Sequence, residues 1–220
     1  MNILMLGDCA FVGKNLCKGL IEAGHHCELI HENTLTKLRE YDIIHIHYPY
    51  HFWKIWPVLR IKHKAVVLHW HGDDARLWYR RLWLKTFFLG IAKANIVSTP
   101  DLLKHVPNST VVTSPVDTDL FKPLPAKLCG TIVLKKRGKY NSLYVRHSAM
   151  PRLLNHFDMA DVDEPRKSVV KELGVFQTEA LACGLTVWHH WDKDRKWVLE
   201  NASIPVATEK LLKVYEEALK

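Results

Sequence analysis

Short apolar runs alternate with segments of helical periodicity along the first half of the chain. The runs are short enough to be buried strands, which we expect at 2–6, 26–30, 43–47, 65–69, 95–98 and 110–113. Between them we expect helices at 12–23, 34–40, 75–93 and 100–105, and Gly24 is a good terminator for the first of these. Strands that alternate with helices predict βαβ units, a parallel sheet and right-handed crossovers.

The pattern is interrupted at 115–125, where three prolines indicate a linker. Beyond this linker the same criteria predict a second, shorter α/β segment. Its strands are expected at 131–134, 140–145 and 185–188, and its helices at 151–157, 179–183 and 209–220. The chain is therefore expected to be an α/β protein with two parts, joined by the proline-rich segment.

Composition and charge narrow the class of protein. Of the 220 residues, 25% are charged and 48% are hydrophobic, which is typical of a globular chain. The five cysteines lack metal-site spacing, so we expect reduced thiols and a cytoplasmic protein. The sequence has no apolar stretch long enough to span a membrane, and residues 1–6 run straight into a strand instead of a signal peptide. The net charge of +8 favours anionic partners.

The most informative stretch is 171–187, which has the sequence KELGVFQTEALACGLTV. Glu179 stands at the start of an Ala/Leu run that ends at Gly184, and an apolar segment follows. This order predicts a loop, a short helix and a buried strand. A carboxylate at a helix start is well placed to bind the hydroxyls of a sugar or ribose, and main-chain amides at the same turn can bind phosphate.

This stretch resembles the donor-site signature of the retaining glycosyltransferases of the GT-B fold, of the family 4-like, group 1 type. In that family a glycine-rich loop leads into a glutamate followed by Ala-Met-Ala-x-Gly. A second resemblance lies at 92–123, where five residues match the end of the family's first domain: Pro115, Val116, Asp117, Phe121 and Pro123. Gly24-His25 and the segments 41–47 and 69–76 also match, so the likeness covers 1–123 and returns over 150–187.

The resemblance implies two Rossmann-like lobes, the second of them reduced, and a minimal version of the family. It implies an acceptor-side domain over 1–122, a nucleotide-sugar-binding domain over 123–205, and a helix over 206–220 that packs back on the first domain. The implied activity is transfer of a sugar from a nucleoside-diphosphate sugar to a glycan or lipid-linked acceptor, with retention of configuration. No metal or other cofactor is expected to be required.

The resemblance also implies roles for individual residues. His71 falls at the strand end near the reaction centre, where it would contact the donor sugar or orient the acceptor. Glu179 would bind the ribose hydroxyls, and the amides of Gly174 and Val175 would line the sugar pocket. Three further residues complete the set: Lys136 and Arg137 as cations for the donor phosphates, and Gly13 on the acceptor side. Asp8 stands at the same turn as Gly13, and from that place we expect it to contact acceptor hydroxyls.

Two departures from the family pattern leave an alternative open. Lys171 stands where the first family glutamate is expected, and the adjacent Glu172 takes that place only if the loop shifts by one residue. Lys171 would instead suit a donor phosphate. The second lobe is also much shorter than a usual GT-B lobe. Both departures fit a non-catalytic module that binds nucleotide-sugars or glycans.

The paired histidines suggest another class of protein. His45 with His47, and His69 with His71, each lie two residues apart and so point to one face at a strand end. Together with Asp73, they approach the ligand pattern of binuclear metallohydrolases, although Asp74 stands where the last histidine of that pattern is expected. We therefore expect no metal site, and keep the metallohydrolase as the less favoured reading.

Two segments combine aromatic and basic residues, at 52–64 and 75–93. Such segments often lie at an anionic membrane surface. The same composition is equally typical of core helices whose cationic side chains extend to the solvent. The expected partners are thus a nucleotide-sugar, a glycan or lipid acceptor, and an anionic membrane surface. We expect no nucleic acid, because no recognition motif accompanies the positive charge.

Overall fold

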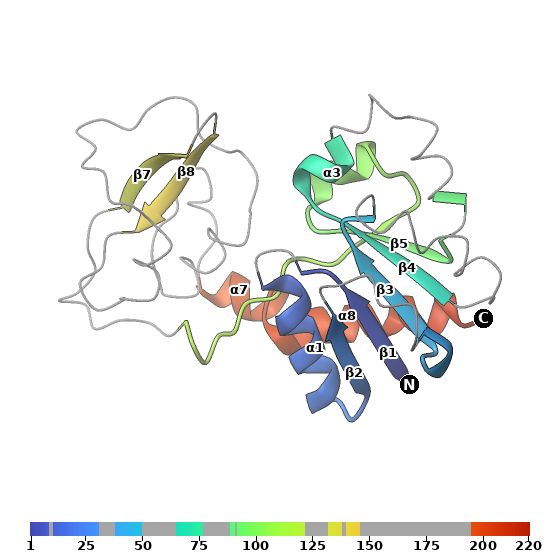
Figure 1. The fold of residues 1–220 in the computed structure, drawn as a ribbon. Coiled ribbons are helices and arrows are strands. Elements are labelled where there is room, and N and C mark those ends of the chain that lie inside the picture. The colour runs from blue at the N-terminus through green and yellow to red at the C-terminus, as the bar shows by residue number, and fades with distance from the viewer. Residues whose placement is uncertain are drawn as a thin grey trace. The chain divides into compact units, whose positions relative to one another are not determined.

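A computed structural model describes nine stretches of the chain: 1–8, 11–30, 38–49, 65–76, 89–90, 92–121, 132–137, 140–145 and 195–220. The chain divides into two compact units (Figure 1). The first unit combines Met1–Pro115 with Ile204–Lys220, and the second spans Val116–Ser203. The first unit is therefore built from both ends of the sequence.

The first unit is organised around a parallel sheet of six strands in the order β2-β1-β3-β4-β5-β6. Its strands are β1 (Asn2–Leu6), β2 (His26–Ile30), β3 (Ile43–His47), β4 (Ala65–Trp70), β5 (Ala94–Val97) and β6 (Thr110–Val111). The other elements are α1 (Val12–Glu22), η1 (Leu38–Glu40), α3 (Gly72–Arg76), η4 (Pro100–Lys104) and α8 (Ile204–Ala218). The predicted α/β class and parallel sheet are confirmed.

The two faces of the central strands differ in chemistry. Every residue of β3 and β4 is buried, as expected for parallel strands that are covered on both sides. On one face, Ile44, Ile46 and Leu68 belong to an apolar core that includes residues of η1, α3 and η4. The alternate residues, among them His45 and His69, point to the opposite face. That second face is the one on which α1 and α8 pack.

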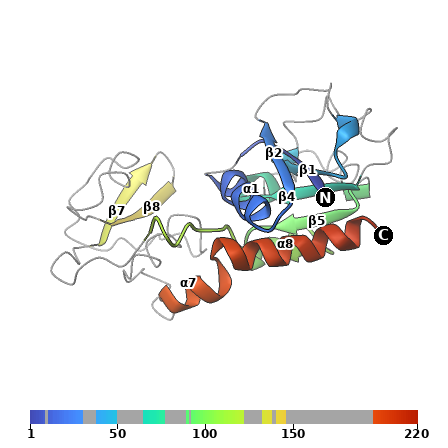
Figure 2. The ribbon, with the colours of Figure 1, turned by 90° about the horizontal axis from the view of Figure 1, so that it is seen from below.

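Helix α8 closes the histidine face of the sheet. It contacts α1, β4 and β5, and Figure 2 shows it running along the sheet beneath these strands. Its buried residues repeat at helical spacing: Ile204, Ala207, Thr208, Leu211, Val214, Tyr215 and Ala218. The helix begins at Ile204 and not at 209, because Pro205 lies in the first turn, where a missing N–H costs nothing.

Several other expected elements differ in extent from those observed. The segment expected as a helix at 100–105 is a 3₁₀ helix, and the strand expected at 110–113 spans only Thr110–Val111. Of the helix expected at 75–93, the start belongs to α3 and 77–88 lies outside the described residues. Of the helix expected at 34–40, only η1 is described. Helix α7 (Arg195–Asn201) was not predicted.

In the second unit, the described strands are β7 (Ile132–Arg137) and β8 (Tyr140–Val145). They pair in antiparallel register, with Arg137 opposite Tyr140. Both segments were expected to be strands. The elements expected at 151–157, 179–183 and 185–188 lie outside the described residues. Among the described residues of this unit, the two strands are antiparallel, and no parallel sheet is present. Among the described residues, no helix is both long enough and apolar enough to cross a membrane.

The close contact of α1 with α8 depends on Gly19. A Cβ added at Gly19 would lie 2.0 Å from Oγ1 of Thr208 and 2.7 Å from Cγ2 of Ile204, so a larger residue cannot fit without moving α8. We predict that Gly19→Ala lowers the free energy of unfolding by about 1–3 kcal/mol, as overpacking typically does. Urea unfolding followed by circular dichroism measures this loss.

The matched control is Gly90→Ala, because a Cβ at Gly90 meets nothing within 4 Å. Thr208→Ala in the Gly19→Ala background removes the nearer of the two clashing groups and should restore part of the lost stability. Equal stability of the Gly19→Ala variant and the parent would contradict the packing of α8 described here.

Candidate functional site

Four histidines form a buried array on the α1–α8 face of the sheet. His45 and His47 come from β3, His69 from β4, and His71 directly follows β4. The register of the two strands places His47 opposite His69. His45, His47 and His69 have no exposed surface, and His71 is 5% exposed. Neighbouring rings stack, with the centroids of His45 and His47 4.6 Å apart and those of His69 and His71 4.2 Å apart.

The four imidazoles and two hydroxyls form one unbranched series of hydrogen bonds, which we call the histidine network. The hydroxyl of Tyr215 lies 2.6 Å from Nδ1 of His45, and Nε2 of His45 lies 3.2 Å from Nδ1 of His69. Nε2 of His69 lies 3.2 Å from Oγ of Ser98. That Oγ lies 2.7 Å from Nδ1 of His71. Finally, Nε2 of His71 lies 2.9 Å from Nδ1 of His47.

The network has one open end. Nε2 of His47 is buried and has no hydrogen-bond partner within the described part of the chain. It lies beside the turn between β1 and α1: a Cβ added at Gly13 would lie 3.3 Å from this nitrogen and 3.2 Å from both Oδ1 of Asp8 and the carbonyl oxygen of Gly7. The main-chain N–H of Gly13 donates to Oδ1 of Asp8 over 2.7 Å. The two acceptor-side residues expected from the sequence therefore lie next to the open end.

This turn lies where α/β sheets usually bind ligands. Strands β2 and β3 lie on opposite sides of β1, so the order in which successive strands are placed across the sheet reverses between β1 and β3. Ligands of open parallel sheets bind outside the carboxyl ends of the strands at such a switch point. Asp8 follows the carboxyl end of β1, and His47 ends β3. The open end of the histidine network therefore lies at the position that the topology favours for a site.

Burial keeps the imidazoles uncharged. It lowers the pKa of His47 to about 3, and it lowers the pKa values of His45, His69 and His71 well below the ordinary value, with a further contribution from repulsion between the neighbouring imidazolium charges. Burial also raises the pKa of Tyr215 well above its ordinary value, so its hydroxyl keeps its proton. Near neutral pH, every member of the network is therefore neutral.

The residue expected to stand closest to the reaction, His71, is held within the network. Both of its ring nitrogens have partners, Ser98 on one side and His47 on the other. Its main-chain N–H donates to Oδ1 of Asp74 over 2.6 Å, and the N–H of Ala75 donates to the same oxygen over 2.8 Å. Asp74, which stands at the place of a metallohydrolase ligand, thus fixes the start of α3.

Three histidines could supply metal ligands. One ring nitrogen each from His45, His47 and His69 lies within 4.8 Å of the other two. Nevertheless, Nε2 of His45 and Nδ1 of His69 are already hydrogen-bonded to each other. The rings of His45 and His47 are stacked with only 19° between their planes, so their lone pairs run side by side and do not converge on one point. A tetrahedral zinc site needs converging lone pairs, which this packing does not offer.

The remaining predicted site residues belong to the second unit. Lys136 and Arg137 lie on β7. The other five lie outside the described residues: Lys171, Glu172, Gly174, Val175 and Glu179. Most of the aromatic and basic segments at 52–64 and 75–93 also lies outside them. Ser98 and Tyr215, by contrast, are members of the network that the sequence did not indicate.

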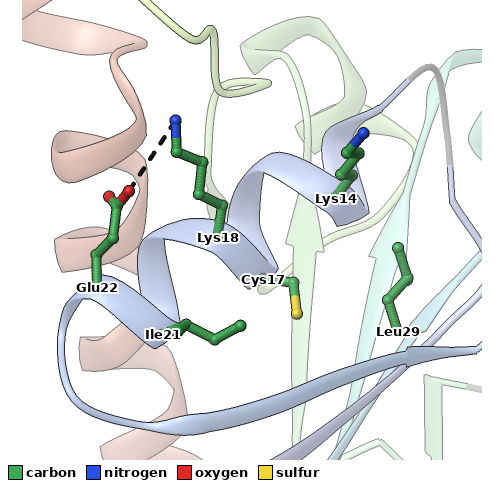
Figure 3. Close-up of a pocket in the computed structure, with 6 residues that line it drawn as sticks. All are labelled: Lys14, Cys17, Lys18, Ile21, Glu22 and Leu29. Atoms are coloured by element: carbon green, nitrogen blue, oxygen red, sulfur yellow. Dashed lines mark ion pairs between the residues drawn. The ribbon is translucent and has the colours of Figure 1, made fainter.

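A separate depression of about 380 Å³ is lined by residues of α1 and by Leu29 of β2 (Figure 3). Six residues line it: Lys14, Cys17, Lys18, Ile21, Glu22 and Leu29. Lys18 and Glu22 form an ion pair of 4.0 Å in which both side chains are largely exposed. None of the lining residues belongs to the histidine network, so this depression is not part of the candidate site.

No protein-family model matches this sequence, and no curated protein is detectably similar to it.

The low pKa values of the network make the protein sensitive to acid. An imidazole of the unfolded chain has a pKa of about 6.5. Below this pH the unfolded chain therefore binds protons that the buried imidazoles of the native protein do not bind. We predict full stability above pH 6.5 and a loss on acidification that continues towards the native pKa of His47, about 3. Each imidazole contributes about 1.4 kcal/mol per pH unit well below pH 6.5. Urea unfolding between pH 5 and 7 measures the slope.

The control for this experiment is His47→Gln, which removes one titrating ring and should reduce the slope by the contribution of one imidazole. A stability that does not change across this range would contradict the neutral, buried state of the network.

Metal content gives an independent check. Because the lone pairs do not converge, we predict that protein purified without chelators holds far less than one zinc ion per chain, as measured by plasma mass spectrometry. The control is His26→Gln, which changes an exposed histidine outside the network. If the protein holds one zinc ion per chain, and if this zinc is lost in His69→Gln but kept in His26→Gln, the prediction is wrong and a metallohydrolase is favoured.

Proposed function

We propose that this protein is a retaining glycosyltransferase that moves a sugar from a nucleoside-diphosphate sugar to a glycan or lipid-linked acceptor. One observation carries the proposal for the first unit: Asp8, Gly13 and His47 come together at the switch point of the parallel sheet. The sugar chemistry comes from the resemblance of 92–123 and 171–187 to the GT-B family.

The location of α8 also supports the proposal. In the GT-B family a final helix returns to the first lobe, and α8 packs on α1 and on strands of the first unit. The family's two-lobed arrangement, with a reduced second lobe, is part of the proposal. Within that arrangement, the second unit binds the donor.

The proposed donor contacts lie in the second unit. Glu179 holds the ribose hydroxyls, while the amides of Gly174 and Val175 line the sugar pocket. Lys171, Lys136 and Arg137 offset the charge of the leaving diphosphate, and Glu172 takes the place of the family's first glutamate. Preorganised cations can supply this stabilisation without a metal ion.

On the first unit, the chemistry suits an acceptor hydroxyl. The carboxylate of Asp8 accepts a hydrogen bond from the N–H of Gly13, and it lies near the neutral imidazole of His47. A carboxylate at this edge repels a phosphate and attracts a hydroxyl donor. The first unit is therefore proposed as the acceptor side.

A second candidate is a non-catalytic module that binds nucleotide-sugars or glycans. The observation that favours it is the state of His71, which is buried and has both ring nitrogens engaged. A histidine held in this way supports the fold whether or not sugar transfer takes place.

Thermal unfolding in the presence of UDP-, GDP- and ADP-sugars tests the proposal. One nucleotide class should raise the stability, by about 2.7 kcal/mol at a concentration one hundred times the dissociation constant. With a radiolabelled form of that donor, transfer to a mixture of glycan and lipid acceptors should follow and should survive addition of EDTA. Asp8→Asn should slow transfer at least tenfold, whereas Glu22→Gln, on the exposed side of α1, should not.

Stabilisation by a nucleotide-sugar without transfer or hydrolysis would select the binding module. Absence of stabilisation by any of the three nucleotide classes would contradict the glycosyltransferase and a module that binds nucleotide-sugars, and would leave a glycan-binding module.

A further inference from the structure

We propose that Cys17 and Cys27 form a thiol–disulfide exchange site, at which Cys17 attacks an anionic low-molecular-weight disulfide and Cys27 then completes an internal disulfide with Cys17. Both residues carry free thiols in this structure. The site lies within the first unit and outside the histidine network, so this proposal does not rest on the proposed function.

The two cysteines meet where α1 packs on strand β2. Cys17 belongs to α1 and Cys27 to β2, the strand that begins the order of the six-stranded sheet. Cys27 and Leu29 are two positions apart on β2, so their side chains lie on the same face of the strand. Leu29 lines the depression together with Cys17. Cys27 therefore lies beneath α1 and beside Cys17, and the two thiols are hydrogen-bonded to each other.

Only one of the two cysteines lines the depression. Each of them has 8% of its surface exposed, but Cys17 is a lining residue and Cys27 is not. In Figure 3 the side chains of Cys17, Ile21 and Leu29 point toward the same space. A reagent in the depression therefore meets Cys17 first, and Cys27 lies behind it.

The hydrogen bond between the thiols makes them chemically different. The thiol of Cys27 donates to the sulfur of Cys17, and this hydrogen bond lowers the pKa of Cys17, although burial and the carboxylate of Glu28 oppose the effect. The same hydrogen bond, together with burial, raises the pKa of Cys27. The thiolate, and not the thiol, attacks a disulfide. The cysteine that lines the depression is thus also the one that ionises more readily.

The depression also indicates the class of reagent. Its volume of about 380 Å³ is in the range of small-molecule sites, which is more room than a peroxide needs. Lys14, Lys18 and Glu22 line it, so its lining carries two positive charges and one negative charge. This balance favours an anionic reagent. A disulfide of small acidic thiols has the required charge and the required reactive bond.

The exchange consists of two balanced steps. The thiolate of Cys17 attacks one sulfur of the reagent, so a mixed disulfide forms, the S–S bond of the reagent breaks, and one reagent thiol leaves with the proton that Cys17 lost. Cys27 then attacks the sulfur of Cys17 and gives its proton to the second departing thiolate. The two cysteines are oxidised by two electrons, and the reagent is reduced to two thiols. Disulfides of this kind in reducing compartments are transient and respond to the redox state.

Peptide mapping of the full chain after exposure to glutathione disulfide tests the proposal. Cleavage after Lys14, Lys18 and Lys37 yields the peptides 15–18 and 19–37, each of which contains one cysteine. Once the remaining thiols have been alkylated, mass spectrometry should find these two peptides joined by a disulfide, which dithiothreitol should break. A stable glutathione adduct on Cys17 with Cys27 still reduced would overturn the exchange site, and so would an unmodified Cys17.

Two matched variants separate the roles of the thiols. In Cys27→Ser the second step is lost, so Cys17 should accumulate as the mixed disulfide with glutathione. In Cys17→Ser the peptide 19–37 should stay unmodified, because Cys27 does not line the depression. Modification of Cys27 in folded Cys17→Ser, as fast as that of Cys17 in folded Cys27→Ser, would reverse the assignment and overturn the proposal.

The parent chain allows the same comparison without any substitution. In the reduced, folded protein, iodoacetamide should alkylate Cys17 at least about tenfold faster than Cys27, because Cys17 is the more ionised thiol. Equal rates, or faster alkylation of Cys27, would contradict the assignment of Cys17 as the attacking group.

The charge of the reagent is tested with two disulfides. Lys14→Gln should slow oxidation by the anionic glutathione disulfide about threefold at low ionic strength, and it should leave oxidation by the neutral hydroxyethyl disulfide unchanged. Equal slowing with both reagents, or no slowing with either, would overturn the anionic class of the reagent.

Discussion

The need to pair buried ring nitrogens is the constraint on which the first unit depends. Four imidazoles on one closed face of a sheet present eight nitrogens, and each one left without a partner costs on the order of 1–3 kcal/mol. The imidazoles cannot satisfy one another completely, so two hydroxyls complete the series, Ser98 after β5 and Tyr215 on α8. Seven nitrogens are paired, and Nε2 of His47 is left. The register of β3 and β4, the end of β5 and the docking of α8 are therefore held together by one polar network.

The central strands β3 and β4 were predictable because they are buried on both faces, which makes short, mostly apolar runs. Strands β1, β2 and β3 begin and end at the predicted residues. Helical ends were less predictable, since they depend on what packs against them. The segment from Ile204 to Thr208 carries a proline and gives a weak periodic signal, yet contact with α1 makes it helical. Short elements such as η4 are decided by local hydrogen bonding, which the apolar pattern does not record.

Only part of the candidate site could be predicted from the sequence. The spacing of His45 with His47 and of His69 with His71 correctly placed them on one face. The resemblance indicated Gly13, and the position of Asp8 at the same turn indicated Asp8. The partners could not be found in this way, because the hydrogen bond from Tyr215 to His45 spans 170 positions of the chain. Asp74 shows the opposite difficulty: it stands within a metal-like motif, but its carboxylate accepts main-chain N–H groups at the start of α3.

The position of α8 has a consequence for biosynthesis. Residues 204–220 leave the ribosome only after the whole of the second unit has been made. These residues form α8, which covers the histidine face of the first unit and carries the hydroxyl of Tyr215 that ends the histidine network. Until then, the nascent Met1–Pro115 segment carries an uncovered polar sheet face and cannot reach its final structure. Translation of residues 116–203 thus sets a minimum waiting time, during which chaperones have access to an unfinished domain.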